Sequence, residues 1–155
     1  MSPISRLAAI PLSALLCSAA IAGGHDQGPP EVKARNAHMA LYSYNMGILG
    51  GMAQEKIPYD AAAAAIAAAN LAAVASMDQS GYWTEGTDNT AMEGTRALPA
   101  IWSDMAKFDE INASFAAATA ALATTAGDGL DALKAGIGEA GAACGTCHKA
   151  FRGPR

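Results

Sequence analysis

Apolar residues recur every three or four positions along four stretches of the chain, which is the spacing of one face of an α-helix. The stretches cover about residues 31–53, 59–77, 100–125 and 130–152. The last stretch has an unbroken apolar stripe: Leu130, Leu133, Ile137, Ala140, Cys144, Cys147 and Phe151. No strand-like alternation of apolar and polar residues is found in the sequence. The pattern predicts an all-α fold, an antiparallel four-helix bundle with up-down-up-down topology.

Residues 78–100 separate the second and third stretches and show no helical period. We expect a long loop there, and loops of this length inside compact domains tend to be functional or mobile. The second stretch is rich in alanine, so another helix can come close to it, either inside the bundle or across a dimer.

Residues 1–22 have the pattern of a secretory signal peptide, with Arg6, then an apolar stretch, then small residues up to Ala22. The apolar stretch is shorter than the ~20 residues that a membrane-spanning helix needs. We expect cleavage after Ala22, export to the periplasm, and a mature domain of residues 23–155. The alternative is a retained membrane anchor.

Composition and charge exclude several classes of protein. Hydrophobic residues make up 52% and charged residues 15%, which argues against a disordered chain. Ten basic and fourteen acidic residues give a net charge of −4 without a basic run, so we expect no nucleic-acid partner. The acids are scattered and there are only three histidines, so we expect no enzyme.

The strongest chemical motif is Cys144-Gly145-Thr146-Cys147-His148, a C-x-x-C-H sequence of the kind to which c-type haem is attached. On a helix, Cys144 and Cys147 lie on one face, where two thiols can reach two vinyl groups on one edge of a porphyrin. His148 follows directly, and histidine is a normal axial ligand of haem iron. The motif predicts one covalently bound haem c, with iron, per chain.

Three other uses of the cysteine pair are weaker. A zinc site needs about four ligands, and only His25 and His38 remain to complete one. A thioredoxin-like thiol-disulfide oxidoreductase has its cysteines in a βαβ context, which this helical pattern does not provide. A disulfide would close a loop too short to stabilise the fold much.

Several motifs together resemble the cytochrome c′ family and its low-spin, methionine-ligated relatives. The resemblance covers about residues 32–152 and rests on four segments: Ala143-Cys144-Gly145-Thr146-Cys147-His148-Lys149-Ala150-Phe151-Arg152, Ile101-Trp102-Ser103-Asp104, Pro58-Tyr59-Asp60-Ala61, and Arg35 with Met39 four residues later. The family is built as a four-helix bundle with covalent haem and often dimerises through its first two helices. It implies thioethers to Cys144 and Cys147 and proximal ligation by His148.

The resemblance also implies roles for residues of the first helix and the C-terminus. Arg35 would meet a haem propionate, with weaker help from Asn36, and Arg152 would lie near the proximal face. Met39 would face the distal side, as a packing residue in high-spin members or as an iron ligand in low-spin ones. Met46 is a less suitable ligand, and His38 points about 100° away from Met39, so we expect neither to bind iron.

The resulting interpretation is a periplasmic one-electron carrier that exchanges electrons with redox partner proteins. The alternative is a high-spin protein that binds NO or CO, with Met39 as a packing residue that does not bind the iron. After signal removal we expect no membrane association, and the chain would permit a homodimer. Trp102 and Tyr59 are expected to be structural.

Overall fold

The computed structural model describes residues 28–154, and the predicted signal peptide, residues 1–22, lies outside this range. Helices and turns make up the described residues, without a strand. The elements are α1 (Pro30–Ala53), α2 (Ala61–Ala75), the 3-10 helix η1 (Ser80–Tyr82), α3 (Ala100–Ser103), α4 (Met105–Thr125) and α5 (Leu130–Phe151). The predicted all-α fold is confirmed.

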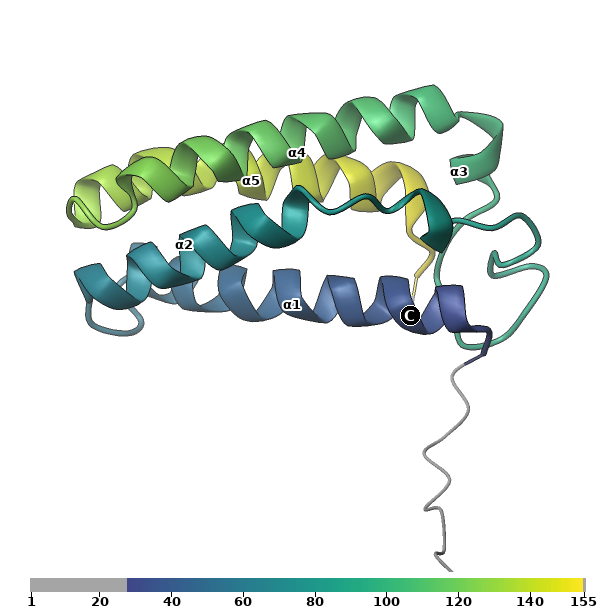
Figure 1. Cartoon of the computed structure of the whole chain (residues 1–155), viewed down its shortest axis with the longest axis horizontal. Helices are drawn as coiled ribbons and strands as arrows, with labels where there is room; N and C mark the ends of the chain where they lie inside the picture. The colour runs from purple at the N-terminus through teal and green to yellow at the C-terminus, as the bar shows by residue number, and fades with distance from the viewer. Residues whose placement is uncertain (1–27, 155) are drawn as a thin grey trace, which may run out of the picture.

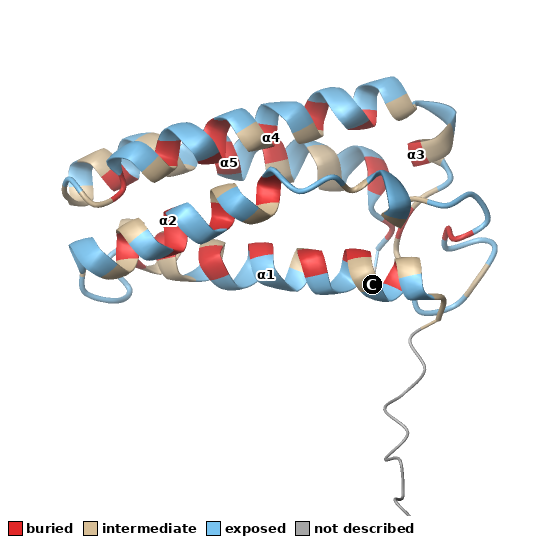
Figure 2. Ribbon diagram, in the orientation of Figure 1, coloured by how far each residue is buried: buried red, intermediate tan, exposed pale blue. Residues whose placement is uncertain are grey.

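The four long helices, α1, α2, α4 and α5, pack side by side as a bundle (Figure 1). Their buried residues lie on the sides that face one another (Figure 2). The main core joins all four helices through fully buried side chains, which include Leu49, Leu71, Leu122 and Leu133. A smaller second cluster, around Ile101, Phe108 and Phe151, joins α3, α4 and the end of α5.

Two aspartates set helix starts that the periodic pattern did not resolve. Asp60 accepts a hydrogen bond from the backbone N–H of Ala63 at 2.7 Å, so α2 begins at residue 61 rather than 59. Asp104 has a non-helical backbone (φ −140°, ψ 56°) and accepts a hydrogen bond from the N–H of Lys107 at 3.2 Å. The expected helix 100–125 is therefore two helices, α3 and α4.

At one end of the bundle, hydrogen bonds of Tyr59 link two segments that are far apart in the sequence. The hydroxyl of Tyr59 donates to the carbonyl of Ala126 at 2.9 Å and accepts from the N–H of Gly129 at 3.0 Å. These bonds join the start of α2 to the turn between α4 and α5. Gly129 has φ 139°, a value that side chains disfavour.

The other end of the bundle is built differently. Because α2 has 15 residues and α1 has 24, η1 and the following loop occupy the position beside the start of α1 (Figure 1). The loop is fastened to the end of α5, since the N–H of Leu98 donates to Phe151 and the N–H of Gly153 donates to Arg96. Among residues 28–154, none of the helices is long and apolar enough to cross a membrane.

Candidate functional site

The two cysteines of the C-x-x-C-H motif lie on α5, half-buried on its inner side. Cys144 packs against the main core, which includes Tyr42 and Phe115. Cys147 packs against the second cluster, beside Phe108 and Phe151. Burial raises the pKa of both thiols. The structure thus presents two protonated thiols, one helical turn apart, to the inside of the bundle.

His148 follows on the same turn and is also half-buried. Burial lowers the pKa of its imidazole, and the positive charges of Arg152 and Arg96 lower it further. The imidazole is therefore held neutral, the form that binds a metal. Arg152 is exposed, as expected for a residue just beyond α5. Arg96 was not identified from the sequence, because only the fold brings the loop beside His148.

Arg35 is buried in α1, with 3% of its surface exposed, and it points to the loop. Its guanidinium donates to Thr87 Oγ1 at 2.8 Å, to Thr95 Oγ1 at 2.6 Å and to the carbonyl of Thr87. It also lies 5.2 Å from the ring centre of Trp83, a cation–π distance. Arg35 thus clamps residues 83–95 onto α1, while the neighbouring Asn36 is exposed.

The next turn of α1 carries Met39 and His38. Met39 is half-buried and packs against the same core as Cys144. His38 is only 3% exposed, and its Nε2 has no hydrogen-bond partner. Its ring lies edge-on to Tyr42 (4.6 Å between centroids) and near Tyr82 of η1 (5.8 Å). A buried polar atom without a partner costs about 1–3 kcal/mol, so this nitrogen requires an explanation.

The sequence could have shown that His38 is buried. Arg35, His38, Tyr42, Asn45 and Leu49 form a seam with the spacing 3, 4, 3, 4, and all five are buried. Because His38 and Asn45 are polar, a search for apolar residues favours Met39 and Met46 instead, which the structure leaves half-buried.

The packing of α1 against α5 sets which residues lie opposite each other. The two helices are adjacent and antiparallel, so α1 begins at the end of the bundle where α5 finishes (Figure 1). Tyr42 on α1 lies close enough to the Cys144 thiol for the thiol to help raise the pKa of the tyrosine. Because the helices are antiparallel, one turn toward the start of α1 and the end of α5 leads from this level to residues 38–39 on α1 and to residues 147–148 on α5.

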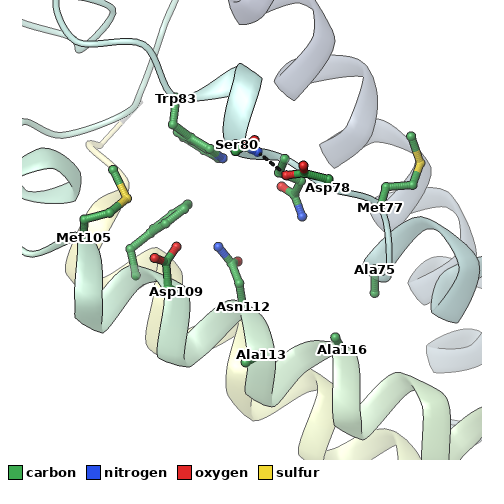
Figure 3. A pocket seen from close by; sticks show the side chains of 12 residues that line it. Ala75, Met77, Asp78, Ser80, Trp83, Met105, Asp109, Asn112, Ala113 and Ala116 are labelled. Carbon is green, nitrogen blue, oxygen red and sulfur yellow. Dashed lines mark hydrogen bonds between the residues drawn. The ribbon is translucent and has the colours of Figure 1, made fainter.

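Aromatic rings belong to the two core clusters against which Cys144 and Cys147 pack. Tyr42 meets Phe115 at 4.8 Å, Trp83 meets Phe108 at 4.7 Å, and Phe108 meets Phe151 at 5.5 Å between centroids. A cavity of about 470 Å³ borders this group between the end of α2, η1 and α4. Trp83, Met105 and Asp109 face it, and Asp78 at its rim accepts a hydrogen bond from Ser80 (Figure 3).

The donor set fits a covalently attached haem better than a bare metal ion. Among residues 28–154, no group of three or more His, Cys, Asp or Glu side chains could hold a metal ion. Two thiols on one helical face, a neutral imidazole beside them, aromatic walls and an unpartnered imidazole nitrogen opposite are features that a porphyrin and its iron would use.

Comparison with known proteins gives the family. Residues 30–152 match the family model described as Cytochrome C'. The chain is 36% identical to cytochrome c-554 from Cereibacter sphaeroides over 152 residues, 98% of each protein. It resembles the solved cytochrome c′ from Rhodobacter Spheriodes, with a TM-score of 0.79, 38% identity, and coverage of 81% of this chain and 96% of that one.

Two other solved relatives bear on function. One is a nitric oxide complex of a cytochrome c prime variant from Alcaligenes xylosoxidans, with a TM-score of 0.69, 31% identity, and coverage of 81% and 94% of the two chains. The other is a cytochrome c′ with ligand-controlled dimer dissociation, with a TM-score of 0.73, 29% identity, and coverage of 80% and 95%. Family members carry covalently bound haem c, and the chain belongs to the cytochrome c′ family.

Proposed function

We propose that this cytochrome is an exported one-electron carrier. Cys144 and Cys147 bind the haem through thioethers, His148 is the proximal iron ligand, and Met39 is the distal ligand. The haem supplies the redox chemistry, and the protein supplies ligands, burial and a docking surface for redox partners. A carrier of this kind has no substrate to transform, so the protein is not an enzyme under this proposal.

The observation that carries the proposal is that Met39 and Cys144 pack against the same core on two adjacent antiparallel helices. Helix rise then favours the α1 turn that contains Met39 as the one that meets the haem opposite His148. A thioether from the facing helix is therefore available on the side of the iron away from His148. A Met/His ligand pair raises the reduction potential and leaves no open position for small molecules.

Three polar residues complete the proposed pocket. Arg35 is buried one turn before Met39, and we assign its guanidinium to a haem carboxylate, which would replace some of its hydrogen bonds to the loop. Arg152 is exposed beside His148, and Asn36 is exposed beside Arg35. We assign these two a smaller part in binding the haem.

Absorption and electron paramagnetic resonance spectra of the oxidised, haem-loaded protein test the electron-carrier proposal. We expect six-coordinate low-spin iron and a methionine–iron charge-transfer band, which Met39→Ala removes. Met46→Ala is the matched control, because Met46 is half-buried on the same helix two turns away and should leave the band in place. A five-coordinate high-spin spectrum of the unmodified protein would reject the proposal.

The second candidate function is NO or CO binding, which the nitric oxide complex of the Alcaligenes relative favours. Under this alternative Met39 only packs, the distal position is open, and addition of CO to the reduced protein shifts the spectrum at once. Under the first proposal the methionine blocks that position and CO binds slowly or weakly.

We also propose that the protein is periplasmic and forms a homodimer through α1 and α2. The dimer is supported by large apolar side chains exposed on these two helices: Leu41 and Tyr44 on α1, which are 49% and 67% exposed, and Ile66 on α2, which is 63% exposed. Sedimentation of Ile66→Asp beside the unmodified protein tests this, and a monomeric unmodified protein would reject it.

A further inference from the structure

His38 is the most buried histidine of the described chain, and the haem ligands proposed above leave it without a role. Its exposed fraction is 3%, and Nε2 finds no hydrogen-bond partner. The side chains around it offer little help. Its ring contacts are with Tyr42 and Tyr82, and the hydroxyl of Tyr42 accepts a hydrogen bond from Gln79 at 3.2 Å instead of meeting the imidazole.

An unpartnered imidazole nitrogen inside a protein is satisfied by water, by a polar ligand or by a metal. Water is the competing occupant, because Gln79, which donates to Tyr42, also has a buried oxygen without a partner. The packing of the two helices favours a metal: Tyr42 and Cys144 share one core, the helices are antiparallel, and one helical turn from that level leads to His38 on α1 and to His148 on α5.

We propose that His38 is a second iron-binding side chain on α1, which takes the sixth coordination position of the haem when Met39 does not occupy it. This inference rests on the proposed attachment of haem to Cys144, Cys147 and His148. Binding requires only that Nε2 donates its lone pair to the iron in place of the methionine sulfur. Because neighbouring residues on a helix point about 100° apart, the two side chains bind alternately and never together.

The consequence is that loss of the methionine bond does not open the iron to small ligands. Hydrogen peroxide transfers one oxygen atom to the sulfur of Met39 and leaves as water, and the sulfoxide that forms no longer offers a thioether donor. If His38 then binds the iron, the coordination changes from Met/His to bis-histidine and the iron stays low-spin. The reduction potential falls, because a methionine ligand raises it relative to histidine.

Spectra of four haem-loaded proteins test the inference: the unmodified protein, His38→Phe, Met39→Leu, and the double variant. Phenylalanine keeps an aromatic ring at position 38, and leucine keeps a side chain of similar volume at position 39, so the helix should still fold. We expect the methionine–iron band in the first two proteins. Met39→Leu should lack that band but stay low-spin, and the double variant should be five-coordinate and high-spin.

Added imidazole provides a second measurement, because a folded double variant with an open iron position should bind it. It should convert the double variant to the low-spin spectrum of Met39→Leu and leave Met39→Leu itself unchanged. The inference is overturned if Met39→Leu is already high-spin and matches the double variant. A low-spin unmodified protein that lacks the methionine band, and becomes high-spin on His38→Phe alone, would reject Met39 as the resting ligand while supporting iron binding by His38.

Discussion

Replacing Arg35 with alanine should loosen the long loop from α1 and lower the free energy of unfolding of the haem-loaded protein. Arg35 joins α1 to residues more than 50 positions later in the chain, through hydrogen bonds to Thr87 and Thr95. Because the loop also borders the end of α5, the change acts on the part of the fold that surrounds His148.

The magnitude follows from four hydrogen bonds, of which the one to the carbonyl of Tyr82 is long at 3.5 Å, and from one ring contact. Hydrogen bonds from a charged donor contribute about 1.5–3 kcal/mol each, but bonds from one side chain are not additive, and water replaces part of them. The cation–π contact with Trp83 adds roughly 0.5–2 kcal/mol. We therefore expect Arg35→Ala to lower the free energy of unfolding by about 3 kcal/mol, or about 100-fold in the equilibrium constant.

Urea unfolding of the oxidised protein measures this loss, and hydrogen exchange at the amides of Asn89 and Leu98 locates it. Lys56→Ala is the matched control, because Lys56 is an exposed cation in the turn after α1 and should change stability by less than about 0.5 kcal/mol. If Arg35→Ala costs no more than Lys56→Ala, the loop is not held by this guanidinium.

Three further predictions concern the bundle itself. Tyr59→Phe removes the hydroxyl that bonds Ala126 and Gly129, so urea unfolding should show a loss of about 1–2 kcal/mol. A loss below about 0.5 kcal/mol would contradict the role of that hydroxyl. Leu122→Ala empties a site that is 1% exposed and should cost about 2–5 kcal/mol in the same assay, and a loss below about 1 kcal/mol would argue against this core. Burial raises the pKa of Tyr42 to about 12, so its stabilising effect is complete below the unfolded value near 10 and is lost as the pH rises through 12. Alkaline unfolding should therefore be less steep in Tyr42→Phe, and an unchanged pH profile would show that Tyr42 does not titrate as its burial requires.

The sequence predicted the parts of the molecule that depend on local spacing. The stripe of α5 gives both the helix and the common face of Cys144 and Cys147, because 3.6 residues per turn place them together whatever surrounds them. The break between α3 and α4 was missed for a related reason. Asp104 caps a new helix within a stretch whose apolar period continues across it.

The partners of α1 could not be predicted in the same way. The polar side chains of His38 and Asn45 give no hydropathy signal, yet the structure buries both. His38 lies against Tyr82 of η1, which only the fold brings to α1. The loop of residues 78–100 has no period, so nothing local indicates that Thr87 and Thr95 hold Arg35, or that Arg96 lies near His148.

Mass spectrometry of the mature protein, produced in a host that assembles c-type cytochromes, tests the central claim most directly. The account predicts one haem per chain, carried by the fragment that contains Cys144 and Cys147, with both thiols resistant to alkylation. Recovery of that fragment at its unmodified mass, with both thiols free to react, would contradict it.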